Sequence, residues 1–332
     1  MSTDNAACAA RGIGEGQIVR ILLAGGTGMI GTVVQRAAQR AGHEVALLVR
    51  TDPPGERQWA WDPIAGLVPA AAIEWADAVV NLAGASIGKM PWTRRYRGEL
   101  VHSRIDATDT LARAITLAQQ PPQVLVNASA VGYYGNRPGE LLDESSDPGQ
   151  GFLSYLTRRW EATAQTAATS TRVVMLRTGL VLGGTGALAP MMLTTKNFLG
   201  ARIGPGTQLW PWIALDDVVG AILHLIEQPV VGPVNLVAPV ATSSAEVTGA
   251  LAHAMARPHA LRLPAGLLRL ALGPAADEML LLSQQITPAA LNDSGYRFQF
   301  LDVRDAVEVA VTGRAGTLYL PPEPQVPEPP AP

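Results

Sequence analysis

The chain has 332 residues, of which 48% are hydrophobic and 16% are charged, and its formal net charge is −3. This is an ordinary composition for a globular protein with one large core or two modest ones, and a slightly acidic chain without a basic run argues against nucleic acid as a partner. The single cysteine, Cys8, excludes an intramolecular disulfide and a cysteine-rich metal site, and it favours a reducing, cytoplasmic location.

Both ends of the chain are predicted to be extensions. Residues 1–17 are small and polar without periodicity, so we expect a flexible segment, and residues 316–332 are rich in proline, which favours a disordered tail. Residues 1–17 also lack the basic start and apolar centre of a signal peptide. No apolar stretch reaches the roughly 20 residues that cross a bilayer, so we predict no membrane partner.

Between these extensions, short apolar runs alternate with helical patterns. The predicted strands are 19–23, 45–49, 78–82, 124–127 and 173–176. Strands separated by amphipathic helices form parallel sheets with helices on both faces. The sequence therefore predicts an α/β fold with a Rossmann-type, doubly wound parallel sheet, mainly within 18–185. The pattern weakens beyond about residue 200, and 186–315 is predicted to be a smaller C-terminal substrate region, with some segments returning to the sheet.

The first predicted strand runs into three regularly spaced glycines. In this spacing Gly25 permits a tight turn, Gly28 lets a pyrophosphate approach the backbone, and Gly31 lets helix and strand pack closely. The exposed amides at the helix start would face the phosphates. The predicted dinucleotide-binding residues of this turn are Gly25, Thr27, Gly28, Met29, Ile30 and Gly31. The alternative is an ordinary turn between a strand and a helix.

The end of the second predicted strand bears on the choice of cofactor. An acidic residue there would accept hydrogen bonds from a ribose hydroxyl, whereas this chain has Arg50, which suits a 2′-phosphate. NADP(H) is therefore predicted over NAD(H). A solvated surface arginine is the alternative, and Asp52, two residues on, keeps NAD(H) open.

Several stretches between residue 19 and about 312 resemble extended short-chain dehydrogenases/reductases. They are most similar to the atypical group of epimerase family proteins, which are NAD-dependent epimerase/dehydratase-like. The stretches are GGTGMIG (25–31), WDP (61–63), DAVVNLAGASI (77–87), WTRRYRGELVHSRIDATDTL (92–111), ASAVGYYG (128–135), WE (160–161), LRTGLVLG (176–183) and WIALDDVVGAI (212–222). In addition, SQQITPAAL (283–291) resembles that group's appended domain of unknown function.

The resemblance implies further cofactor-binding residues. Asn81, Leu82, Ala83 and Gly84 would line the adenine side of the cofactor and brace the central strands. The nicotinamide end of the cofactor would lie along Arg177, Thr178 and Gly179. The residues themselves agree in part, because small residues at the carboxyl end of a strand leave room for a ligand there.

The catalytic residues depart from the superfamily pattern. That pattern has a Ser or Thr that holds the substrate oxygen, a Tyr that transfers a proton, and a Lys four residues later that lowers the pKa of the tyrosine. The only lysines here, Lys89 and Lys196, follow Ala85 and Met192 by four residues, so no Tyr-x-x-x-Lys exists. Ser129 falls at the serine position and is the predicted holder of the substrate oxygen.

Two registers of the helix in GFLSYLTRRWEATA, residues 151–164, compete for the place of the tyrosine. One register gives Tyr155 and Arg159, which lie one helical turn apart and face the same way. The other aligns Glu161 with an acidic residue of the superfamily, puts Leu153 and Thr157 where Tyr and Lys belong, and leaves the site without an acid. A surface position for Tyr155 and Arg159 is a further alternative.

Four other side chains are candidates for the site. Tyr133 and Tyr134 are rival proton donors, because they lie nearer Ser129 in sequence, although they can equally be packing residues. Arg104 lies within the apolar face of a predicted helix, so it must pair with a structural carboxylate or hold an anionic substrate group. Trp212 is predicted to stack on a substrate ring or to pack in the core.

Hydride transfer at a carbonyl or carbinol carbon of a small molecule is the leading functional hypothesis, with Ser129 polarising the oxygen. The resemblance keeps nucleotide-sugar epimerisation or dehydration open. The missing lysine keeps open a non-catalytic NADP(H)-binding sensor or scaffold. The five histidines show no metal-ligand spacing, so no metal is predicted, and the sequence predicts no oligomeric state.

Overall fold

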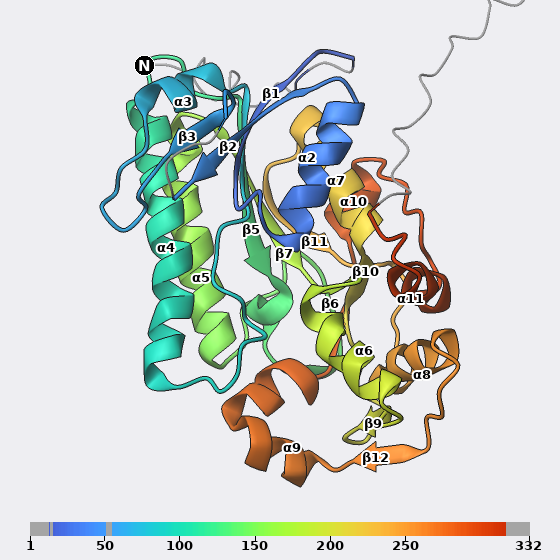
Figure 1. Ribbon diagram of the computed structural model, residues 1–332. Helices are drawn as coiled ribbons and strands as arrows, with labels where there is room; N and C mark the ends of the chain where they lie inside the picture. Colours follow the sequence, from blue (N-terminus) through green and yellow to red (C-terminus); the bar gives the residue numbers. More distant parts are fainter. Residues whose placement is uncertain (1–12, 14–15, 51–54, 317–332) are drawn as a thin grey trace, which may run out of the picture.

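The computed structural model describes residues 13, 16–50 and 55–316. Seven strands form one sheet in the order β11-β7-β5-β4-β1-β2-β3, and all neighbouring pairs in it are parallel (Figure 1). The strands are β1 (Arg20–Ala24), β2 (Glu44–Val49), β3 (Gln58–Ala60), β4 (Ala78–Asn81), β5 (Val124–Ala130), β7 (Arg172–Thr178) and β11 (Gly232–Leu236). The predicted doubly wound parallel sheet is confirmed.

Helices cover both faces of this sheet, which is why its strands are continuous apolar runs. The helices are α2 (Met29–Arg40), α3 (Ala70–Trp75), α4 (Arg94–Leu117), α5 (Phe152–Gln165) and α7 (Leu215–Glu227). Figure 1 shows α4 and α5 side by side on one face and α2 and α7 on the other. In β1, Ile21 and Leu23 pack in the α2/α7 layer, and Leu22 and Ala24 pack in the layer that includes α3 and α4.

Most of the other elements gather beyond the carboxyl ends of the sheet strands (Figure 1). Three pairs of short parallel strands lie there, namely β6 (Arg137–Leu142) with β13 (Gln284–Ile286), β8 (Leu180–Leu182) with β10 (Trp212–Ala214), and β9 (Ala201–Ile203) with β12 (Leu261–Leu263). The helices of this region are α6 (Ala189–Lys196), α8 (Ser244–Ala254), α9 (Ala265–Leu272) and α11 (Val303–Val311), and a separate apolar cluster forms their core. The short helix α10 (Ala289–Asp293) returns with α7 and β11 to the apolar layer on the large sheet.

The predicted extensions lie largely outside the described residues, as do Cys8 and Asp52. One residue of the N-terminal stretch, Ile13, is buried against the α2/α7 layer. In the part of the chain that the structure describes, no helix combines the length and apolar character needed to cross a membrane.

At two of the three glycines in this turn, the backbone leaves no room for a side chain, as expected from the sequence. Gly25 has a φ of +81°, and a Cβ there would lie 2.7 Å from the carbonyl carbon of Leu82. A Cβ on Gly31 would collide with the carbonyl oxygen of Gly25, because α2 starts directly against the end of β1. Gly28 has an extended φ of −76° and precedes the first residue of α2. Gly25 and Gly31 are therefore required by close packing.

We predict that Gly31→Ala destabilises the protein by about 1–3 kcal/mol, because backbone atoms block the added methyl group. Gly98→Ala is the matched control. It lies inside α4 with nothing within 4 Å of the added Cβ, and it should stabilise the protein by about 0.5–1 kcal/mol. Urea unfolding measures both values. Equal stabilities for the two variants would contradict this account of the turn.

Candidate functional site

Two neighbouring cavities lie at the carboxyl ends of the sheet strands. The first has a volume of about 270 Å³ and the second of about 370 Å³. Ile30 lines the first and Met29 the second, and α7 contributes Val218 to the first and Leu215 to the second. The cavities are thus adjacent along the start of α2 and α7, which is the crevice where open parallel sheets bind ligands.

The second cavity has the features of a phosphate site. Thr27, Gly28 and Met29 line it together with Gly184 and Thr185. No side chain caps the start of α2, so its first backbone amides are open to a ligand. The bare backbone at Gly28 also leaves space for a pyrophosphate. The residues present therefore fit the diphosphate of a dinucleotide, as the sequence predicts for this turn.

Arg50 follows the last residue of β2 and is exposed. Its guanidinium makes no ion pair with a described residue, and residues 51–54 lie outside the described part. An exposed guanidinium at this strand end is open to a 2′-phosphate.

The last residue of β4 has a structural role, and the three residues after it line a cavity. Asn81 is fully buried and donates from Nδ2 to Oδ1 of Asn127 (2.7 Å) and to Oγ1 of Thr108 (3.0 Å), so it braces β4, β5 and α4. Leu82, Ala83 and Gly84 line the first cavity. They share that cavity with Ser129, and their place on the adenine side of the cofactor stays a prediction.

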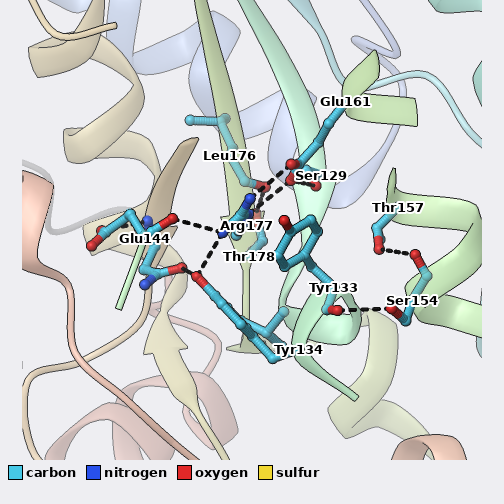
Figure 2. A network of polar contacts seen from close by, with 12 residues as sticks. Ser129, Tyr133, Tyr134, Glu144, Ser154, Thr157, Glu161, Leu176, Arg177 and Thr178 are labelled. Carbon is cyan, nitrogen blue, oxygen red and sulfur yellow. Dashed lines mark hydrogen bonds and ion pairs between the residues drawn. The ribbon is translucent and has the colours of Figure 1, made fainter. Parts of the chain in front are cut away.

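The first cavity is bordered by a buried polar network (Figure 2). Ser129, at the end of β5, donates from Oγ to Oε1 of Glu161 on α5 at 2.7 Å. Arg177 of β7 holds the same carboxylate with two hydrogen bonds of 2.9 Å, from Nε and Nη2. Glu161 and Arg177 are 8% and 3% exposed, so this is a buried ion pair. It joins α5, β7 and β5 below the cavity.

That the nicotinamide end passes Arg177 stays a prediction, and the side chain of Arg177 is held in the buried network. Its side chain does not line either cavity, because alternate residues of β7 face opposite sides of the sheet and its neighbours Leu176 and Thr178 line the first cavity. Arg177 instead donates to the hydroxyl of Tyr134 (2.9 Å) and lies 3.5 Å from the ring centroid of Tyr133. Gly179 is a packing residue, since a Cβ there would collide with the carbonyl oxygen of Pro211.

Tyr134 is part of this network and is no proton donor at the cavity. Its hydroxyl donates to Oδ1 of Asn235 at 2.7 Å, and burial raises its pKa to about 12. Tyr133 is half-buried, with its ring against Arg177 and edge-on to Tyr134. Neither tyrosine lines the first cavity.

Ser129 faces the cavity as a hydrogen-bond acceptor. Its hydroxyl has one hydrogen, and a carboxylate can only accept, so the hydrogen bond to Glu161 uses that hydrogen. The two hydrogen bonds from Arg177 stabilise the ionised carboxylate. The predicted role of Ser129 as a donor that polarises a carbonyl therefore does not match this arrangement, whereas acceptance from a ligand hydroxyl does.

The structure decides between the two registers of α5. Leu153 and Thr157 line the first cavity, whereas Tyr155 is 53% exposed and Arg159 is exposed beside it. The assignment of proton transfer to Tyr155 and Arg159 is therefore wrong. The buried stripe of α5 passes through Leu153, Thr157 and Trp160, and it turns the Tyr155 side of the helix to solvent.

Arg104 of α4 also lines the first cavity. Its Nη1 donates to the carbonyl oxygen of Leu100 at 3.1 Å, and its guanidinium lies 5.2 Å from the ring centroid of Trp160. Among the described residues, no carboxylate forms an ion pair with Arg104, so the structural pairing that the sequence left open is not found.

Trp212 has a packing role. Its side chain is 1% exposed in the C-terminal core, and its Nε1 donates to Oγ1 of Thr242 at 2.9 Å. The prediction that it stacks on a substrate ring is wrong, because it lines neither cavity.

Sequence reasoning missed two carboxylates that hold α5. Glu161 served only to align α5 with the superfamily pattern. A glutamate directly after a tryptophan of the buried stripe indicates a buried carboxylate that must pair with a positive charge. Glu278 accepts from the amides of Phe152 (2.9 Å) and Leu153 (2.7 Å), and so caps α5 from the C-terminal region. A separation of 125 residues leaves no local signal for that contact.

The comparisons with known proteins agree with this geometry. A model described as the NAD dependent epimerase/dehydratase family matches residues 21–239, and a domain of unknown function, DUF1731, matches residues 263–310. An epimerase family protein of Mycobacterium leprae is 39% identical over 295 residues, which cover 88% of this chain and 95% of that protein. The human epimerase family protein SDR39U1 is 37% identical, over 88% of this chain and 100% of its own.

Two solved structures are also similar. A crystal structure of human SDR39U1 with NADPH has a TM-score of 0.81 at 36% identity, and the match covers 88% of this chain and 99% of that chain. A nucleoside-diphosphate sugar epimerase from Corynebacterium glutamicum has a TM-score of 0.73 at 30% identity, over 93% of this chain and 62% of that chain.

The buried pair gives a stability prediction. Glu161→Gln should destabilise the protein by about 3–5 kcal/mol, because it leaves the guanidinium of Arg177 buried without a counter-charge. Glu140→Gln is the control, since Glu140 pairs with Arg137 at the surface and its loss should change stability little. Chemical unfolding measures both. A small effect at position 161 would show that the pair does not hold these elements together.

Proposed function

This chain belongs to the NAD-dependent epimerase/dehydratase family and has its NAD(P)-binding fold, and from that premise we propose that it is an NADP(H)-dependent oxidoreductase acting at the hydroxyl-bearing carbon of a small molecule. The observation that carries the proposal is Ser129. It faces a cavity beside the dinucleotide turn, and its hydroxyl is held as a hydrogen-bond acceptor by Glu161.

Two observations support NADP(H) over NAD(H) as the cofactor. Arg50 is exposed at the end of β2, where a guanidinium can bind a 2′-phosphate. In addition, human SDR39U1, 36% identical, was crystallised with NADPH. Thr27, Gly28 and Met29 would hold the diphosphate, and the nicotinamide end would reach the cavity lined by Ala83, Gly84 and Thr178.

The nicotinamide cofactor supplies, when bound, the acceptor or donor of hydride. Ser129 would accept a hydrogen bond from the substrate hydroxyl and so fix the carbinol in the cavity. As the carbinol is oxidised, Oγ of Ser129 takes the hydroxyl proton while its own proton moves to Oε1 of Glu161. Arg177 orients the carboxylate of Glu161 with two hydrogen bonds before that transfer. Leu153, Leu156 and Trp160 keep water from this end of the cavity.

One observation favours a second candidate function. In the described structure no tyrosine lines the first cavity, so the side chain that transfers the proton in related reductases is missing there. A cofactor-binding sensor or scaffold without turnover would need no such group. Nucleotide-sugar epimerisation draws its support from the Corynebacterium glutamicum protein.

The test is single-turnover reduction of protein-bound NADP⁺ by a panel of secondary alcohols and hydroxy compounds, followed by absorbance of the reduced nicotinamide. We expect Ser129→Ala to lower the rate by about 100-fold or more, because it removes the proton relay. Tyr155→Phe is the control and should leave the rate unchanged, since Tyr155 faces solvent.

Three results would contradict the proposal. An unchanged rate in Ser129→Ala would remove Ser129 from the reaction. Tight binding of NADP⁺ without turnover by any compound would favour the sensor. A chain that does not bind the cofactor would overturn the assignment of the glycine turn.

A further inference from the structure

Arg104 places a positive charge in a cavity wall that is otherwise neutral. The other described residues that line this cavity are apolar, glycine, or hydroxyl-bearing like Ser129 and Thr157. The guanidinium is thus the only charged group among the described residues that face a ligand there.

The position of this guanidinium is built by its neighbours. Nη1 is held by the carbonyl oxygen of Leu100, and the plane lies near the ring of Trp160 on α5. Gly84 leaves room for it, because a Cβ at that position would lie 3.2 Å from Cγ and Cζ of Arg104. The other N–H donors of the guanidinium are available to bind a ligand.

A counter-ion would stabilise this half-buried guanidinium. Removing a guanidinium from water is costly unless an anion compensates it, and no described carboxylate pairs with Arg104. Burial lowers the pKa of Arg104 to about 10, so the group remains protonated at neutral pH. The cofactor's diphosphate would not compensate it, because the phosphate-binding turn lines the other cavity and Arg104 does not.

We propose that Arg104 binds a carboxylate of the substrate, which makes the substrate a small hydroxy acid with an apolar body. A single guanidinium matches a monoanion, whereas a phosphate monoester would bring up to two charges to one cation. Leu153, Leu156 and Ile87 would contact the apolar body, and the hydroxyl would meet Ser129. This inference rests on the proposed function and names its substrate class.

The test measures binding to the NADPH-loaded protein through the fluorescence of the bound nicotinamide. The probes are 2-hydroxy acids with branched or aromatic side chains, the amide of each acid, and a phosphate monoester of similar size. The variants are Arg104→Met, Arg104→Lys and, as the matched control, Arg95→Met, which changes an exposed arginine on the same helix.

We expect at least one acid to bind the wild type about tenfold or more tightly than its amide, since charge-assisted hydrogen bonds are the stronger ones. Arg104→Met should lose this preference and keep its affinity for NADPH. Arg104→Lys should retain part of the preference, and Arg95→Met all of it.

The proposal is overturned if no acid binds, if acids and amides bind equally, if the phosphate ester binds more tightly than the acids, or if Arg104→Met still prefers the acid. Binding of NADPH is measured first on every variant. A wild type that does not bind NADPH defeats the proposed function itself, whereas NADPH binding without acid preference defeats only the assignment of Arg104.

Discussion

The buried ion pair between Glu161 and Arg177 is the interaction on which the site depends. Both side chains are almost fully removed from water, a cost that is offset only by close, two-fold hydrogen bonding of the kind seen here. Because the partners lie on α5 and β7, the pair fixes the distance between that helix and the sheet. It also fixes Ser129, whose hydroxyl is bound to the same carboxylate. The chemistry available at the cavity follows from that one constraint.

The first cavity has different side chains from the tyrosine and lysine of the superfamily pattern. The superfamily pattern takes both its tyrosine and its lysine from one helix, and α5 here offers Leu153 and Thr157 at the cavity instead. The positive charge comes from Arg104 on α4, the neighbouring helix, and lies near Trp160 of α5. A guanidinium cannot relay a proton as an ammonium can, so this charge suits binding an anion. Proton movement would pass through Ser129.

The sequence predicted the parts that depend on local pattern. The central strands and the glycine turn follow from apolar runs and spacing, because β1, β4 and β5 are buried on both sides and Gly25 sits at a strand end. The edge strands carry a weaker signal, because β3 has only three residues and β11 begins with Gly232 and Pro233, which interrupt an apolar run. Tyr155 was misplaced because helical periodicity predicts a buried stripe but not which flank of that stripe faces the cavity. The roles of Glu278 and Trp212 depend on contacts that are distant in sequence. For Arg104 the sequence left two roles open, a structural ion pair or the binding of an anionic substrate group.

The most direct measurement is a crystal structure of this protein with NADPH. We expect the diphosphate against Gly28 at the start of α2, the 2′-phosphate at Arg50, and the nicotinamide ring in the cavity lined by Ser129 and Thr178, with Glu161 and Arg177 still paired. A nicotinamide ring bound outside that cavity, or a Ser129 hydroxyl turned away from Glu161 with the cofactor in place, would contradict it.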